Sequence, residues 1–88
     1  MFTTYVIYNK DKNKIYIGQT ANLKQRLDRH NGKLPNKTSS FTAKNKGQWL
    51  LVHKEFFTER KQAISREREL KSARGRKFIK NLIINKPL

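Results

Sequence analysis

The chain of 88 residues carries 21 Lys and Arg against six Asp and Glu, so its formal net charge at pH 7 is +15. This length forms one small domain, and the surplus of positive charge favours a polyanionic partner, nucleic acid first. Without cysteine, and with only two histidines, the chain excludes disulfide frameworks, thiolate zinc sites and thiol catalysis. We find neither the roughly 20 apolar residues of a membrane span nor a signal-peptide pattern, and we expect a cytoplasmic protein.

Two stretches of β-branched and aromatic residues, 2–8 and 15–17, predict a β-hairpin because a polar segment with turn-forming Asn and Asp separates them. Side chains alternate between the two faces of a sheet. If the turn holds an even number of residues, Tyr5 and Tyr16 therefore point to one face and Tyr8 points to the other. Core packing of the three rings is the ordinary interpretation of this pattern.

A first helix is predicted after the hairpin, with Thr20 or Asn22 as its N-cap and with its end near His30. Residues 33–47 then contain Pro, Gly, Ser, Asn and several lysines, which indicates a long loop. A loop of this length suggests a binding role, so we expect its lysines, Lys44 among them, to contact a polyanionic substrate.

The second half of the chain predicts one strand and two helices. The apolar run 49–53 is typical of a third strand, and Thr58 can cap a helix that reaches about Ala73, where Gly75 interrupts it. The apolar residues within 78–84 fit a last short helix. The order ββα–loop–βαα predicts an α+β fold, a small three-stranded antiparallel sheet flanked by helices, because a parallel sheet needs a crossover between strands.

Two helical positions carry charge beside apolar residues. Glu67 lies three residues after Ile64 and three before Leu70, so it shares the apolar stripe of the second helix. A carboxylate there is costly unless it is paired or bound to a metal ion, and the ordinary interpretation is an edge glutamate paired with a neighbouring arginine. Arg26 and His30, four residues apart, flank the apolar edge of the first helix, where Arg26 can extend along the surface and His30 can stabilise the helix end.

Together these groups offer one sheet face with two phenols, an arginine, a histidine and a carboxylate in a strongly basic domain. Phosphodiester hydrolysis uses such a set: Mg²⁺ binds through a carboxylate, phosphate and water, and arginine stabilises charge on the phosphoryl oxygens. A histidine or a deprotonated tyrosine can take the proton of the attacking water. A tyrosinate would need nearby cations, since a free phenol titrates near ~10.

The motifs resemble those of the GIY-YIG nuclease family. Tyr16-Ile17-Gly18, followed by Arg26 and then His30, is similar to the second motif of the family. The first motif is degenerate and lacks its glycine, and Tyr5 best matches the position of its tyrosine. Residues 63–71 resemble the helix that bears the family's single metal-binding glutamate. The resemblance covers nearly all of a single domain over residues 1–88, and it extends more distantly to the N-terminal nuclease domain of an incision protein of excision repair.

The resemblance implies a metal-dependent DNA endonuclease that cleaves phosphodiester bonds with one divalent cation, Mg²⁺ or Mn²⁺. Tyr5 and Tyr16 would activate or orient the nucleophilic water, Arg26 would stabilise the developing charge, and Glu67 would hold the metal ion. His30 would act as a base or contact phosphate. The implied substrate is DNA, branched or damaged, in repair or recombination.

The resemblance also carries over residues that contact substrate. Gly18 would allow close packing or a close approach of the substrate, and the late asparagine of the family matches Asn81 better than Asn85. Gln19 follows the glycine where some members have lysine, which removes one cation near the tyrosines. Relatives often obtain specificity from a second domain, so a protein partner or an oligomer would supply it here. The alternative function is a non-catalytic nucleic-acid-binding module.

Overall fold

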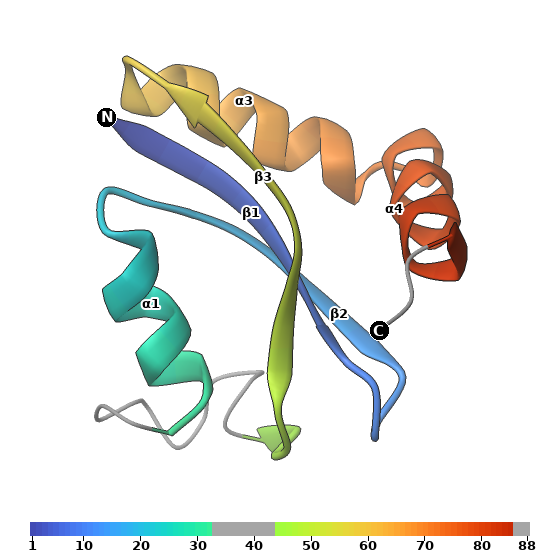
Figure 1. Ribbon diagram of the computed structural model, residues 1–88. Coiled ribbons are helices and arrows are strands. Elements are labelled where there is room, and N and C mark those ends of the chain that lie inside the picture. Colours follow the sequence, from blue (N-terminus) through green and yellow to red (C-terminus); the bar gives the residue numbers. More distant parts are fainter. Residues whose placement is uncertain (33–43, 86–88) are drawn as a thin grey trace.

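The computed structural model describes residues 1–32 and 44–85, and it has the expected α+β fold (Figure 1). Its elements follow in the order β1 (Phe2–Asn9), β2 (Lys14–Thr20), α1 (Leu23–His30), β3 (Trp49–Phe57), α3 (Arg60–Lys71) and α4 (Ala73–Asn85). The three strands form an antiparallel sheet in the order β2-β1-β3, with α1 on one face and α3 and α4 on the other. Within the described ranges, no helix is long and apolar enough to cross a membrane.

The hairpin turn sets which tyrosines meet. The register pairs Asn9 with Lys14 and Tyr5 with Gly18, so four residues form the turn and the condition of an even number is met. Tyr5 and Tyr16 therefore share a face, while Tyr8 lies on the other face of the sheet. Asn13 closes the turn with a φ of 52°, a left-handed conformation that Asn tolerates.

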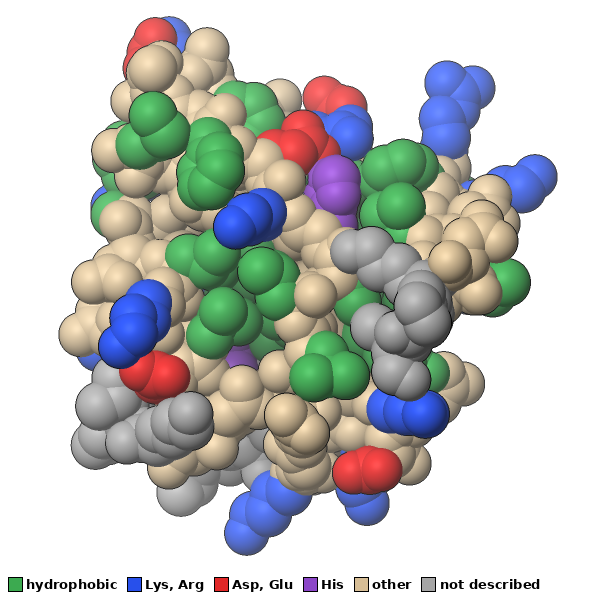
Figure 2. Space-filling model, viewed as in Figure 1, with side chains coloured by type: hydrophobic (Ala, Val, Ile, Leu, Met, Phe, Trp, Pro, Cys, Tyr) green, Lys and Arg blue, Asp and Glu red, His purple; other side chains and the backbone are tan. Residues whose placement is uncertain are grey.

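Each face of the sheet has its own hydrophobic core. The core under α3 and α4 consists of Val6, Ile17, Val52, Leu70 and Ile79. The core on the α1 face consists of Tyr5, Ile7 and Trp49, against which Tyr16, Leu23, Leu27 and Leu51 pack. Lys and Arg side chains project from the molecule in several directions in the view of Figure 2 rather than gathering in one patch. On the face that Figure 2 shows, the positive charge is thus not concentrated in one patch.

Two predicted boundaries in the second half are wrong. The third strand continues beyond 53 to Phe57, because its last residues pair with β1. Charged side chains interrupt the apolar run there, so the sequence did not indicate a strand. Thr58 is not the N-cap of α3; Glu59 is, and its backbone N–H donates to the Gln62 side chain over 3.2 Å. Gln62 three residues after the cap is the better start signal.

Gly75 lies inside α4 and does not separate the two helices. The chain turns at Ser72, whose extended backbone ends α3 and whose hydroxyl accepts a hydrogen bond from the Gly75 N–H at 3.2 Å. A Cβ on Gly75 would overlap the Glu69 carbonyl oxygen and the Leu70 backbone. The glycine therefore permits α4 to pack directly on the end of α3.

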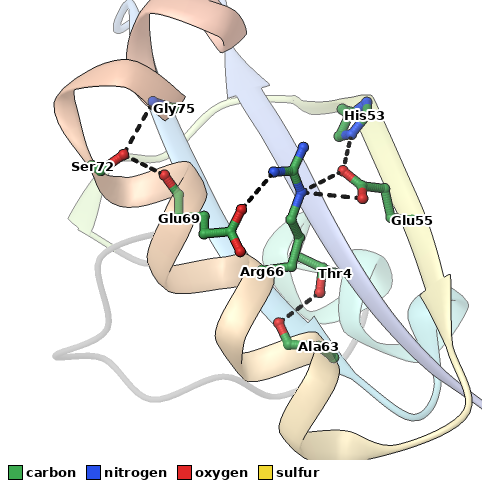
Figure 3. A network of polar contacts seen from close by, with 8 residues as sticks. All are labelled: Thr4, His53, Glu55, Ala63, Arg66, Glu69, Ser72 and Gly75. Atoms are coloured by element: carbon green, nitrogen blue, oxygen red, sulfur yellow. Dashed lines mark hydrogen bonds and ion pairs between the residues drawn. The ribbon is translucent and has the colours of Figure 1, made fainter.

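A buried hydroxyl fixes α3 on the sheet. Thr4 of β1 is fully buried, and its Oγ1 donates a hydrogen bond of 2.8 Å to the carbonyl oxygen of Ala63, which is also fully buried (Figure 3). A buried hydroxyl without a partner is costly. This bond therefore sets the position of α3 along β1 and, with it, the position of Glu67.

We expect Gly75→Ala to destabilise the protein by about 2 kcal/mol, the usual cost of overpacking. Helix propensity alone predicts the opposite sign, because Ala is favoured over Gly inside a helix. Urea unfolding measures the difference. Gly32→Ala is the control, since a Cβ at Gly32 meets no atom within 4 Å and only its φ of +79° opposes the change. An equal or smaller loss for Gly75→Ala would contradict the tight contact.

Candidate active site

Tyr5, Tyr16 and His30 form a cluster on the α1 face of the sheet. The Tyr5 hydroxyl lies 2.9 Å from Nε2 of His30, and Tyr5 is fully buried. The ring centroids of Tyr16 and His30 are 4.8 Å apart, and those of the two tyrosines are 6.2 Å apart. Three predicted site residues from β1, β2 and the end of α1 thus meet in one place.

Gly18 makes this cluster possible. A Cβ on Gly18 would lie 2.8 Å from the Tyr5 hydroxyl oxygen and 2.9 Å from Cε1 of Tyr16. Real Cβ atoms essentially never come this close to other atoms. Since neither ring can occupy its place over a larger residue, the glycine provides close packing of the two phenols.

Arg26 joins the cluster from α1, one helical turn before His30. Its guanidinium interacts mainly with the Tyr5 hydroxyl and more weakly with Tyr16. These contacts raise the pKa of Arg26, although burial alone would lower it. The Nε atom of Arg26 is buried and has no hydrogen-bond partner within the described residues. This N–H is therefore a buried donor that no described acceptor satisfies.

The protonation states within the cluster follow from burial. Burial raises the pKa of Tyr5 to about 12, so this phenol keeps its proton at neutral pH. Burial, and secondarily the charge of Arg26, lowers the pKa of His30 to about 4, so the imidazole is neutral. The nearby cation Arg26 does not make Tyr5 a tyrosinate, because desolvation outweighs the contact with Arg26. The two groups therefore face each other as a neutral phenol and a neutral imidazole.

Glu67 comes from α3, which packs on the opposite face of the sheet from α1. Its side chain is 22% exposed, and its Oε2 lies 2.8 Å from Nζ of Lys71. The expected ion pair is therefore present, with a lysine in place of the expected arginine. Glu69, two residues along, is 64% exposed and contacts Arg66 instead.

A groove along the edge strand β2 connects the two halves of the site. Its volume is about 910 Å³, and both Tyr16 and Lys71 line it. Because Lys71 holds the Glu67 carboxylate, the groove extends from the tyrosine cluster to the partner of the glutamate. The edge of β2 is thus the place where groups from both faces of the sheet border one space.

The residues around Glu67 limit how a metal ion can be held. No group of three or more His, Cys, Asp or Glu side chains suited to a metal ion occurs in the parts of the chain that the structure describes. A single carboxylate does fit Mg²⁺, which often keeps several waters and completes its shell with substrate phosphate. Glu67 is the residue that would hold the ion, and Lys71 now occupies its carboxylate.

A second polar network orients α3 from the β3 side (Figure 3). The Glu55 carboxylate accepts two hydrogen bonds from Nε of Arg66, at 3.1 and 2.9 Å, and lies 2.7 Å from Nε2 of His53. Burial would raise the pKa of Glu55, but the hydrogen bonds from His53 and Arg66 outweigh it and lower the pKa. A charge within a strand is the only sequence signal for this network, because Glu55 and Arg66 are eleven residues apart.

Asn31 is the C-cap of α1 and also contacts the backbone of β3. Its Oδ1 accepts a hydrogen bond of 2.7 Å from the Trp49 N–H, and its Nδ2 donates to the Trp49 carbonyl oxygen at 3.2 Å. The end of α1, where His30 lies, is thereby tied to the start of β3. A single asparagine pairing with a strand backbone leaves no pattern in the sequence.

Lys44 and Asn81, predicted to contact substrate, are both exposed. Asn81 lies on α4, on the opposite side of the sheet from the tyrosine cluster, and the structure does not bring it to Tyr5 or Arg26. Of the long loop that we expected to contact substrate, residues 33–43 lie outside the described residues.

His30 should make stability depend on pH. A histidine whose folded pKa is lowered from its ordinary value near 6.5 to about 4 stabilises the fold above that range, and the contribution is lost as the pH falls through it. We expect a loss on the order of 2 kcal/mol in wild type, measured by urea unfolding at a series of pH values. His30→Gln lacks the titrating group and should lose correspondingly less. Equal losses in the two proteins would contradict a neutral, half-buried His30.

Comparison with known proteins agrees with this geometry. The family model of the GIY-YIG catalytic domain matches residues 1–81. A UPF0213 protein from Bacillus halodurans, whose structure was determined in solution by NMR, is 27% identical and has a TM-score of 0.52; the match covers 93% of this chain and 85% of that one. No curated protein matches. The fold, the paired tyrosines over a glycine and the family match lead to one conclusion: the chain belongs to the GIY-YIG family of endonuclease domains.

Proposed function

We propose that the protein is a metal-dependent DNA endonuclease that hydrolyses phosphodiester bonds with one divalent cation. The observation that carries the proposal is the cluster of two phenols, a neutral imidazole and a partly unpaired guanidinium over Gly18. A protein that only binds phosphate needs surface lysines and arginines. It does not need a neutral histidine 2.9 Å from a buried phenol.

Each residue of the cluster receives one role. Tyr16, which borders the groove, orients the attacking water, and the neutral His30 takes a proton while the Tyr5 hydroxyl holds its ring. Arg26 directs its free Nε–H to a phosphoryl oxygen as charge builds up there. At Glu67, Mg²⁺ or Mn²⁺ would supply positive charge for the phosphate oxygens. Lys71 must then release the carboxylate, and it can pair with phosphate instead.

The proposed substrate is DNA, including branched or damaged DNA in repair or recombination, in the cytoplasm. The net charge of +15 supplies a general footprint for phosphates. We propose that a protein partner or a second copy of the chain adds specificity. The pairing of Glu67 with Lys71 favours one alternative, a nucleic-acid-binding module in which the carboxylate never binds metal.

Cleavage of plasmid, branched and single-stranded DNA with Mg²⁺ or Mn²⁺ tests the proposal. We expect Arg26→Ala to lower the cleavage rate by about 10²–10³-fold, as for other residues that stabilise transition-state charge. DNA affinity should change little, because one contact among many phosphates contributes little. Glu67→Gln should abolish the metal dependence together with the activity.

Glu69→Gln is the matched control, since Glu69 lies on the same helix, two residues from Glu67, and is largely exposed. It should cleave like wild type. The same trace cleavage in wild type and Glu67→Gln would refute the enzymatic function and leave the binding module. A large loss of affinity at unchanged rate in Arg26→Ala would refute the role of the arginine.

A further inference from the structure

The groove between β2 and α4 has a composition that hydrolysis alone does not explain. It is lined by Tyr8, Asn13, Lys14, Ile15, Tyr16, Ile17, Lys71, Arg76, Lys80, Ile83 and Ile84. Its volume of about 910 Å³ lies in the upper part of the roughly 300–1,000 Å³ range of ligand pockets. Only Tyr16 of the catalytic cluster borders it, so most of the groove lies beyond the proposed site of cleavage.

The charged side chains of the groove are all positive. Lys14, Lys71, Arg76 and Lys80 border it, and no carboxylate is among the described residues that line it. Arg76 is held in place because its Nε donates to the Lys71 carbonyl oxygen at 3.1 Å. Cations on a strand edge and on a facing helix are complementary to a backbone that carries phosphates at intervals.

The rest of the lining is largely apolar. Four isoleucines contribute to it, and Ile84 near the end of α4 is 77% exposed. Tyr8 adds an aromatic ring whose hydroxyl donates to the Asn13 side chain over 3.0 Å. Phosphates gain nothing from isoleucine, and the bases of an intact duplex are stacked inside it. Unpaired bases, in contrast, offer apolar faces that can pack on such side chains.

We propose that this groove binds a short stretch of unpaired nucleotides of a DNA strand, with bases on the isoleucines and phosphates on the lysines and Arg76. The inference deepens the proposed function, on which it rests, because Tyr16 connects the groove to the site of cleavage. The protein then selects DNA in which a strand is unpaired beside the bond to be cut. Charge and apolar surface in one groove identify this ligand, whereas neither alone would.

Fluorescence anisotropy with a blunt hairpin duplex and with the same hairpin carrying an unpaired tail tests the proposal, in EDTA so that no cleavage occurs. We expect wild type to bind the tailed DNA about tenfold more tightly. Ile84→Ser should lower this preference about threefold or more, and Ile84→Trp should raise it, since an indole offers a larger face for a base. Met1→Ser, which removes an equally exposed apolar side chain (76%), is the matched control and should keep the preference.

Lys80→Ala tests the phosphate contacts. It should weaken binding of the tailed DNA and reduce the dependence of its affinity on salt by about one counterion. Lys77→Ala, on the same helix but outside the lining, should leave the preference for the tail unchanged. If poly-glutamate displaces the tailed DNA as strongly as unpaired DNA does, the groove recognises charge alone. That result would overturn the proposal.

Equal affinity of wild type for the two hairpins, or an Ile84→Ser variant with the full preference, would also overturn it. These outcomes are separate from failure of the proposed function, because binding is measured without metal. A protein that prefers the tail but never cleaves refutes the nuclease and supports the groove. A protein that cleaves plasmid DNA but shows no preference for the tail supports the nuclease and refutes the groove as a site for unpaired DNA.

Discussion

The approach of two tyrosine rings over Gly18 is the constraint on which the site depends. The glycine removes the one side chain that would separate Tyr5 from Tyr16, and the four-residue turn places both on the same face. Arg26 and His30 then complete the cluster from α1 because one helical turn separates them. A tight turn, a glycine and one turn of helix are therefore enough to assemble three polar groups around one buried phenol.

The sheet divides the protein into two separately packed halves. The α1 face carries the phenols, the imidazole and the guanidinium, whereas the carboxylate is on a helix of the opposite face. That helix is tied to β1 through Thr4 and to β3 through Glu55 and Arg66, so its position relative to the strands is determined twice. At the edge of β2, groups from the two halves border one groove, which Tyr16 and Lys71 both line.

Patterns local in sequence predicted much of this structure. The alternation of the hairpin and the parity of its turn indicated the shared face of Tyr5 and Tyr16, and the stripe of α3 indicated the partly buried position of Glu67. Contacts between distant segments could not be predicted, since the hydrogen bond from Thr4 to Ala63 spans 59 residues. The prediction for Gly75 was wrong for the same reason: its role is a contact with another helix, and glycine usually ends one.

Two hydrogen bonds between the Asn31 side chain and the Trp49 backbone join the end of α1 to the start of β3, which residues 33–43 separate in the sequence. Asn9 reinforces this closure, because its buried amide donates to the carbonyl oxygens of Asn45 and Lys46. The end of α1 thus keeps its position beside the start of β3 through hydrogen bonds of asparagine side chains. A change at Asn31 would consequently shift the adjacent His30 through the backbone, although Asn31 makes no contact with the tyrosines in these hydrogen bonds.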